Sequence, residues 1–190
     1  MAKTIDEYLA EITTLAGDRA LSTRWFSDQV RSLVPSKMQE TTIIQSIRRG
    51  DNSSRPVYGG MNLYWYDAKL KESLPYWDAF PLVVPIKKFA NGFLGINFHY
   101  LSIPMRLKLL ERMDPYIVDN SKIGWNKVAK IKYTRPCVKR YLAKNVQSRF
   151  LKISRENYAT VCMLPVQKFK KVDGAFNYKT VHAESRRMIL

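Results

Sequence analysis

The sequence predicts an α+β protein, with an N-terminal helical arm at residues 1–54 followed by a β-rich domain at residues 55–190. Three observations predict this class. Apolar residues recur at helical spacing in the first third of the chain, later segments are rich in aromatic residues, and Asn91-Gly92 separates two β-prone segments. We therefore expect a small antiparallel β-sheet or a partly open β-barrel with inserted helices.

The first third of the chain predicts three short helices, at residues 4–16, 20–33 and 36–49. Thr4-Ile5-Asp6-Glu7 has the pattern of a capping box, in which the two outer side chains each bind a free backbone N–H. Short amphipathic helices cannot bury an apolar face alone, so these helices must pack on one another or on a partner. The polar segment Asp51–Pro56 is the linker that we expect to end the arm.

The middle of the chain predicts strands. Met61–Asp67 is rich in Tyr and Trp, and Phe80–Ile86 is a second β-prone segment whose two prolines favour a sheet edge or a short interrupted strand. Asn91-Gly92 is a strong hairpin signal, and Phe93–Leu101 is the returning strand. The many aromatic residues of this region are expected to form the core, with some of them in a subunit contact.

The remaining segments are predicted from their spacing. The tail from Lys170 is weakly patterned. The predicted elements are a helix capped by Ser102 that runs through Met113, a strand at Val128–Tyr133, a helix at Pro136–Val146, and strands at residues 148–153 and 161–169.

The charge of the chain is concentrated at one end. The formal net charge is +16, and residues 1–120 contribute little of it, with 15 Lys and Arg against 13 Asp and Glu. Residues 121–190 hold 17 Lys and Arg against 3 acidic residues. Such crowding costs self-repulsion, which indicates a negatively charged partner.

The basic residues nearest to the predicted Pro136–Val146 helix are the candidate binding surface. On that helix Lys139, Arg140 and Lys144 would lie close together. Interleaved aromatic residues are typical of surfaces that bind phosphate backbones and stack bases. A surface that docks onto acidic protein subunits remains open. The predicted binding residues are Lys130, Lys132, Arg135, Lys139, Arg140, Lys144, Arg149 and Lys152, with Lys168, Lys170 and Lys171 as a second cluster.

The residues that usually carry enzyme or metal chemistry are scarce. The chain has two histidines, His99 and His182, and two cysteines, Cys137 and Cys162, without metal-ligand spacing, and it has no phosphate-binding glycine loop. We expect no metal and no cofactor. We expect both cysteines to be buried, and His99 to be a hydrogen-bonded structural residue.

A metal-dependent nuclease is a distant alternative. Asp67-Ala68-Lys69 has the spacing of an acidic residue and a lysine that hold a divalent cation and a water, with Asp51 or Asp78 as a second carboxylate. Such a tripeptide also occurs by chance, and Asp67 more simply ends a strand as a turn residue.

Part of the chain resembles small virion or hypothetical proteins of contractile-tailed bacteriophages. The resemblance lies in Tyr64–Lys69, Leu74–Val83 and Gly92–Leu101, with Pro136–Leu142 in the same pattern. It implies a virion component of the tail, baseplate or neck, assembled in the host cytoplasm. No catalytic residue comes with it.

The leading hypothesis is a non-enzymatic structural or assembly protein of a tailed-phage virion, which docks through its basic surface onto other virion subunits or DNA. The alternative is a nucleic-acid-binding accessory protein. No apolar run reaches the length of a bilayer-spanning helix, so we expect no membrane insertion.

Overall fold

A computed structural model describes residues 52–116 and 125–190. The chain divides into two compact units, residues 1–46 and 47–190, and every described residue belongs to the second unit. The three helices expected before residue 50 lie outside the described residues. The boundary between arm and β-rich domain therefore stays a prediction.

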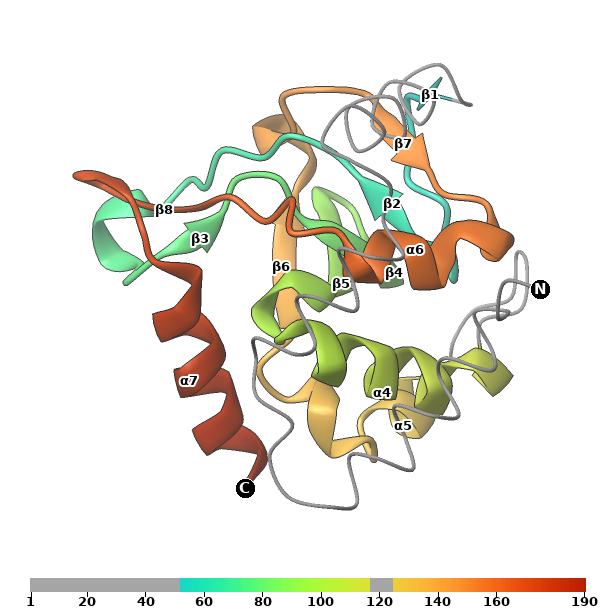
Figure 1. The fold of residues 1–190 in the computed structure, drawn as a ribbon. Helices are drawn as coiled ribbons and strands as arrows, with labels where there is room; N and C mark the ends of the chain where they lie inside the picture. The colour runs from blue at the N-terminus through green and yellow to red at the C-terminus, as the bar shows by residue number, and fades with distance from the viewer. Residues whose placement is uncertain (1–51, 117–124) are drawn as a thin grey trace, which may run out of the picture. The chain divides into compact units, whose positions relative to one another are not determined.

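The described residues form two antiparallel sheets with helices, which confirms the α+β class (Figure 1). The sheets are not closed into a barrel. The six-stranded sheet has the order β1 (Asn52–Ser53), β7 (Phe150–Lys152), β2 (Asn62–Leu63), β4 (Leu82–Phe89), β5 (Gly92–Asn97) and β6 (Val138–Leu142). The three-stranded sheet has the order β3 (Trp77–Asp78), β8 (Phe169–Lys171) and β9 (Gly174–Ala175).

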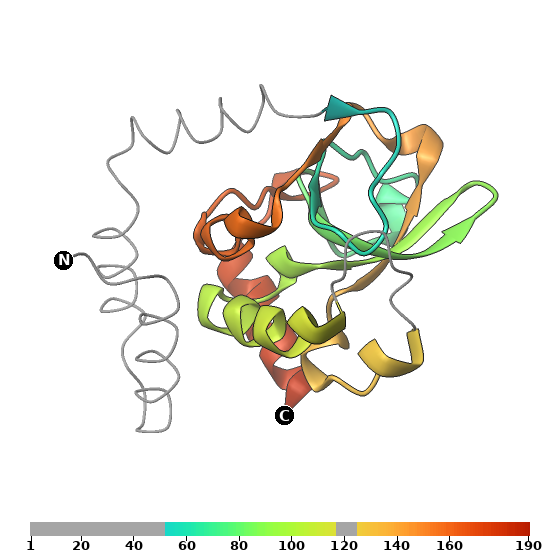
Figure 2. The ribbon, with the colours of Figure 1, turned by 90° about the vertical axis from the view of Figure 1, so that its right-hand side faces the viewer.

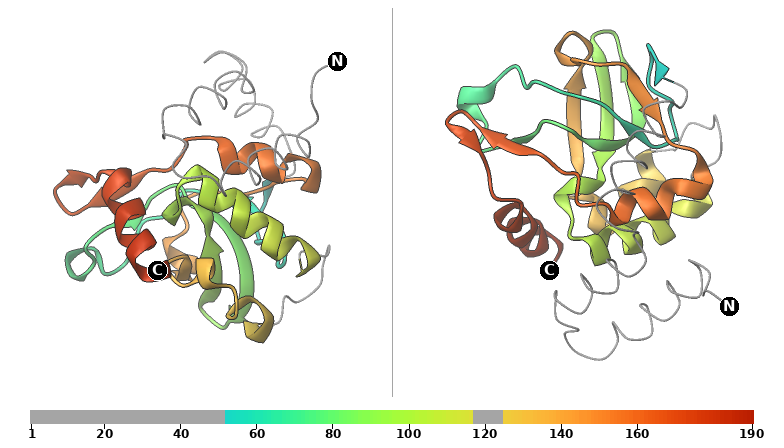
Figure 3. Two further views of the ribbon diagram at one scale, coloured as in Figure 1. Left: turned by 60° about the horizontal axis from the view of Figure 1, so that its bottom comes forward. Right: turned by 45° about the horizontal axis from the view of Figure 1, so that its top comes forward.

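Figure 1 shows helices α4 and α5 below the strands and α7 at the left. In both views of Figure 3, α7 lies at the end of the molecule that is distant from β1. Within the described residues, no helix is long and apolar enough to span a membrane. The α-helices are α4 (Ile103–Met113), α5 (Trp125–Val128), α6 (Tyr158–Met163) and α7 (Tyr178–Ile189). The 3-10 helices are η1 (Lys71–Ser73), η2 (Phe98–Tyr100), η3 (Asp114–Tyr116), η4 (Lys132–Thr134), η5 (Ala143–Asn145) and η6 (Arg155–Asn157).

The β4–β5 hairpin confirms the turn predicted at Asn91-Gly92, and it stands out in Figure 2. Two alternatives were predicted for the first strand of this hairpin, a sheet edge or a short interrupted strand, and the first is wrong because β4 lies between β2 and β5. The pairing register shifts between Pro85 and Lys87. Proline has no N–H to donate to a neighbouring strand. The irregular β4–β5 hydrogen bonding at this point allows a proline within an interior strand.

Several predicted elements are corrected by the structure. Asn52–Ser53 is not linker but the short strand β1, paired with β7. The strand predicted at Val128–Tyr133 is wrong, since these residues form the end of α5, a turn and the start of η4. The helix predicted at Pro136–Val146 is also wrong, because Val138–Leu142 is β6, hydrogen-bonded to β5. The pairing partner, which lies far away in sequence, decides these short segments.

Other predictions are confirmed. Helix α4 follows Ser102 and carries Pro104 in its first turn, as its sequence predicts. Strand β7 lies within the predicted strand at residues 148–153. The strand predicted at residues 161–169 is wrong for its first part, which belongs to α6, and the tail contains a helix, α7, that was not predicted.

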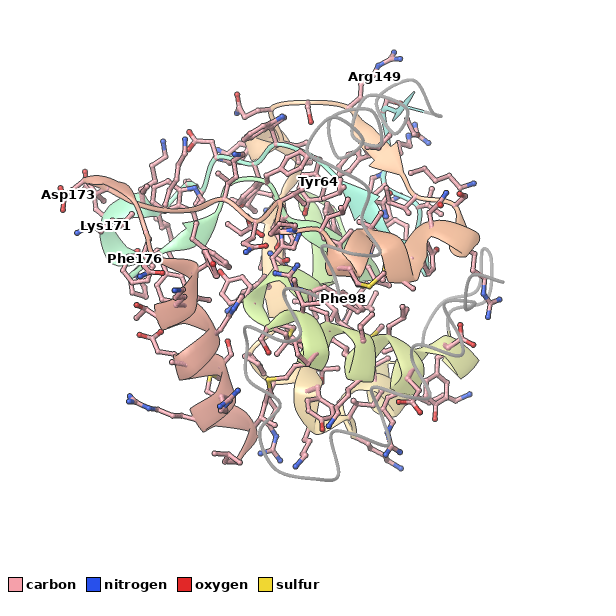
Figure 4. All side chains as sticks on the ribbon, in the orientation of Figure 1. Tyr64, Phe98, Arg149, Lys171, Asp173 and Phe176 are labelled. Atoms are coloured by element: carbon pink, nitrogen blue, oxygen red, sulfur yellow. The ribbon has the colours of Figure 1, made fainter. Side chains whose placement is uncertain are left out.

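Aromatic side chains of the middle region form the core between the sheets, as predicted. The Tyr64 side chain is 1% exposed. Its ring packs edge-on to those of Tyr66, Phe93 and Tyr141, with ring centroids 5.6–6.4 Å apart. Such edge-to-face pairs stabilise beyond the area they bury. Figure 4 shows Tyr64 and Phe98 within the molecule.

The carboxylate of Asp78 joins the two sheets. Asp78 lies on β3, and its Oδ2 accepts hydrogen bonds from Asn97 Nδ2 at 3.0 Å and from His99 Nδ1 at 2.9 Å, both at the end of β5. Its Oδ1 accepts from the backbone N–H groups of Phe80 at 3.0 Å and Lys168 at 3.2 Å. The charge is buried but fully hydrogen-bonded, which is the condition under which a protein tolerates it.

Candidate functional site

The structure places the eight predicted binding residues in separate regions. Strands β6 and β7 are separated by β2, β4 and β5 in the sheet, so Lys139 and Arg140 lie four strands away from Lys152. Lys130 and Lys132 lie near the end of α4. In Figure 4, Arg149 lies at the top of the view, and Lys171 of the second predicted cluster lies at the left. The basic side chains therefore do not form one continuous patch.

One predicted grouping is corrected directly. Lys139, Arg140 and Lys144 were expected on one face of a helix, but the first two are successive residues of β6 and the third lies in η5. Successive strand residues point to opposite faces of a sheet. Arg135 is exposed at the end of η4, Lys144 is exposed, and their role in binding stays a prediction.

Lys130 and Lys132 belong to a surface hollow of about 970 Å³, which we call the basic hollow. Among the described residues, four cations and one carboxylate line it, together with two tyrosines. The Nζ atoms of Lys127 and Lys132 each lie 5.8 Å from a tyrosine ring centroid, those of Tyr116 and Tyr133. The residues that line the basic hollow are Glu111, Arg112, Tyr116, Lys127, Lys130, Ile131, Lys132 and Tyr133.

Lys139 and Arg140 belong to a second cavity, of about 560 Å³, which we call the aromatic pocket. It lies where the edge strand β6 meets β3 and the loop before it. The pocket is lined mainly by aromatic and aliphatic side chains. The residues that line it are Tyr66, Ala68, Lys69, Leu70, Leu74, Pro75, Tyr76, Trp77, Asp78, Tyr100, Lys139, Arg140, Tyr141 and Leu142.

Lys139 is the most unusual cation of the aromatic pocket. Its Nζ lies 4.1 Å from the centroid of the Tyr100 ring. Among the described residues it forms no ion pair with a carboxylate. Burial lowers the pKa of Lys139, although the Cys137 thiol opposes the shift. The Lys139 ammonium is half-buried, and its neighbour is the Tyr100 ring, with no carboxylate among the described residues to pair with it. This arrangement favours a role in binding a ligand.

Arg140 points away from Lys139. Its guanidinium lies 3.8 Å from the centroid of the Phe89 ring and donates a hydrogen bond to the amide oxygen of Asn91. Both partners belong to the β4–β5 hairpin, so the hairpin holds this exposed cation beside the pocket. A guanidinium that stacks on a ring keeps donors free for an anion.

The buried polar residues His99 and Asp78 are hydrogen-bonded to each other within the protein. His99 is fully buried and its Nδ1–H donates to Asp78, which confirms the prediction of a hydrogen-bonded structural histidine. Burial would raise the pKa of Asp78, but the His99 and Asn97 side chains and the Phe80 N–H lower it overall. Burial lowers the pKa of His99 more than Asp78 raises it, so this ring is neutral at pH 7.

Both cysteines are buried and unpaired, as predicted. Burial raises the pKa of the Cys162 thiol to about 12 and that of Cys137 still higher, which keeps both thiols protonated at pH 7.

The carboxylates of the nuclease alternative that the structure describes, Asp67 and Asp78, interact with other protein groups. Asp67 forms an ion pair with Lys71, with 2.6 Å between Oδ2 and Nζ. Asp78 uses both oxygens in the hydrogen bonds between the sheets. Asp51 lies outside the described residues. Among those described, no three His, Cys, Asp or Glu side chains gather as a metal site would need.

Comparison with protein families gives one match that covers nearly the whole chain. The family model of the phage T4 terminal DNA protecting protein matches residues 5–185. The chain belongs to this family. Comparison with curated proteins and with solved structures gave no match.

Membership in the terminal DNA protecting protein family confirms the coarse expectation of a bacteriophage protein. It does not support the predicted placement in the tail, baseplate or neck. The family match extends beyond the aromatic segments that carry the sequence resemblance, and it includes the arm and the basic region.

In this member of the terminal DNA protecting protein family, sequence reasoning missed part of each cavity. Arg112 and Tyr116 of the basic hollow come from the nearly neutral part of the chain, where no local charge excess points to them. Trp77 and Tyr76 of the aromatic pocket were assigned to the core. They come to lie beside Lys139 because β3, in the three-stranded sheet, and β6, in the six-stranded sheet, line the same pocket, and no local sequence pattern encodes that.

Proposed function

We propose that this protein is a non-enzymatic phage protein that binds the ends of duplex DNA, with the basic hollow contacting the phosphate backbone next to the end. The observation that carries the proposal is the family match over residues 5–185, because the family is described as a terminal DNA protecting protein. The basic region of the sequence and the basic hollow supply cations that can bind the phosphates of DNA.

The basic hollow has the composition of a phosphate-binding surface. Of the lining residues that the structure describes, Arg112, Lys127, Lys130 and Lys132 are cations, and Glu111 is the one carboxylate. Each cation that neutralises a phosphate releases condensed counterions, which drives binding without regard to base sequence. Contacts of this kind position a protein on DNA. A protein that covers DNA ends of any sequence needs this kind of contact.

The place of action that we propose is the phage DNA end, during assembly in the host cytoplasm and then in the virion. This replaces a position in the tail or baseplate, which the family match does not support. Docking onto acidic virion subunits remains the competing use of the same cations, and the experiment below separates the two.

The test compares a linear duplex with the same DNA as a closed circle, using the full chain. We expect tighter binding to the linear DNA, with protection from an exonuclease, because only the linear form has ends. The double variant Lys130→Gln with Lys132→Gln should lower the salt slope of log K by about 1.8, at about 0.9 per phosphate contact.

The matched control is Lys87→Gln with Lys88→Gln. These two lysines are exposed on β4, and the control removes the same charge away from the hollow. An unchanged slope in the hollow variant would contradict the hollow as the contact. Equal binding to circle and linear DNA would contradict end binding. No affinity at low salt would favour the protein subunits as the acidic partner.

We also propose that the protein cleaves nothing. The support is the occupation of Asp67 and Asp78 described above. Plasmid DNA incubated with the protein and magnesium or manganese should stay intact. Cleavage that disappears in Asp67→Ala would overturn this proposal and restore the nuclease alternative.

A further inference from the structure

The aromatic pocket has a shape and lining that phosphate contacts do not need. Its volume of about 560 Å³ falls within the range of roughly 300–1,000 Å³ for small-ligand sites. Two large apolar side chains of its wall, Leu70 and Leu74, are 63% and 39% exposed. Apolar side chains exposed around a concave aromatic wall indicate an occupant with apolar faces.

Two residues that line the pocket carry hydrogen-bond donors without an acceptor among the described residues. The indole N–H of Trp77 is buried, and no acceptor among the described residues reaches it. The Lys139 ammonium has the Tyr100 ring as its neighbour and no carboxylate within the described part of the chain. Both groups donate and cannot accept. A buried donor without a partner costs free energy, so an occupant with acceptors on its edge would stabilise the site.

Two further cations lie among the residues that line the pocket. Lys69 and Arg140 are both exposed. The occupant therefore has flat apolar faces, acceptors on its edge and a negative charge outside the pocket. A nucleotide combines these three properties, because a base is a flat ring with carbonyl and ring-nitrogen acceptors, and its phosphate is an anion.

We propose that the aromatic pocket holds the unpaired terminal nucleotide of a DNA strand, with the base against Trp77 and Lys139 and the phosphate at the exposed Lys69. The inference rests on the proposed function. It explains how the protein would distinguish the end of a DNA duplex from its interior. A paired base inside a duplex must be unstacked and unpaired to enter a pocket, and that cost is least for a base that is already single-stranded.

The experiment measures the affinity of the full chain for three short linear duplexes. One has a single unpaired terminal nucleotide, the second has an abasic residue at the same position, and the third has blunt ends. We expect the terminal base to raise affinity at least about fivefold over the abasic end, the lower limit for stacking of one base on aromatic groups. A terminal 2-aminopurine should change its fluorescence on binding, and an internal paired one should not.

Two conservative variants assign the effect to the pocket. Lys139→Met keeps the stem and removes the charge, and Trp77→Phe keeps a ring and removes the N–H. Each should lower the affinity for the end with a base more than the affinity for the abasic end, and so reduce the gap between the two. Lys179→Met, on an exposed lysine of α7 that lines neither cavity, is the matched control and should leave the gap intact. Urea unfolding of each variant verifies that it folds.

The outcomes separate this inference from the proposed function. Equal affinity for base and abasic ends, with linear DNA still preferred over a closed circle, overturns the pocket and leaves end binding in place. Equal affinity for linear and circular DNA overturns both. A free deoxynucleoside monophosphate that binds without competing against the terminal base also overturns the pocket as a DNA site. A gap that Lys139→Met reduces and Lys179→Met preserves supports it.

Discussion

At the scale of single residues, Asp78 is the position on which the two sheets depend most. Its carboxylate accepts four hydrogen bonds, two on each oxygen. Asp78→Asn replaces one acceptor by an amide group that faces donors. We expect a loss of about 3–5 kcal/mol in the free energy of unfolding, as for a buried charged group that loses its partner. Urea unfolding measures it.

Asp114→Asn is the matched control for that change. Asp114 also accepts a hydrogen bond from a side chain, that of Arg155, at 3.0 Å, but its own side chain is 55% exposed. Exposed ion pairs contribute little because water screens them, so the control should change stability by less than about 1 kcal/mol. Equal effects of the two variants would contradict the role assigned to Asp78.

His182 gives the protein a predicted sensitivity to acid. Its Nε2–H donates to the backbone oxygen of His99 at 3.0 Å. Burial lowers the pKa of His182 from 6.5 to about 4, with nearby Arg106 acting in the same direction. Between these pKa values the unfolded chain binds a proton that the folded chain does not, so stability falls as pH decreases from 6.5 to 4.

His182→Gln should weaken that dependence, because glutamine keeps a donor for the His99 oxygen and does not titrate. The measurement is the urea midpoint at several pH values between 7 and 4, for the protein and the variant. The two curves should converge as pH decreases. Parallel curves would show that another group controls the acid response.

At the scale of elements, the β5–β6 contact depends on the absence of a side chain at Gly92. A Cβ at this position would lie 2.0 Å from the backbone oxygen of Tyr141, which cannot move without breaking the β5–β6 pairing. We expect Gly92→Ala to cost about 2–4 kcal/mol, at the upper end of single-site effects. Thermal or urea unfolding of the full chain measures it.

Gly174→Ala separates the steric effect from the backbone effect. Gly174 has a φ of +125°, but a Cβ there meets no atom within 4 Å. Its cost comes from backbone conformation alone, about 1–3 kcal/mol. A smaller loss in Gly92→Ala than in Gly174→Ala would contradict the close approach of β6.

The same elements show where sequence reasoning succeeds and where it fails. Asn91-Gly92 and the Ser102 cap are local signals, and both predicted elements are present. Val138, Tyr141 and Leu142 have helical spacing, yet pairing with β5 makes this segment a strand. For a segment this short, spacing fits either structure, and the partner strand decides. Helix α7 was missed because its buried stripe includes Ser185, which breaks the apolar pattern.

At the scale of the whole molecule, the charge asymmetry is visible in the sequence, but its arrangement in space is not. Residues 121–190 carry nearly all the excess charge, and folding distributes it over both sheets and α7. Of the predicted binding residues, Lys130 and Lys132 do share a hollow, and Lys139 and Arg140 share a pocket. Their neighbours Arg112 and Trp77 come from distant segments, so only the topology reveals the two cavities.

The strand order has a consequence for how the chain is made. Strand β7 inserts between β1 and β2, and β8 supplies the partner of β3. A nascent chain that has not yet left the ribosome beyond residue 150 holds β1 and β3 without the strands they pair with, and closing such long loops makes folding slow. Both sheets can therefore be completed only after nearly the entire polypeptide has been translated. The cation-rich C-terminal part supplies strands that the fold needs, so it cannot be removed without disrupting both sheets.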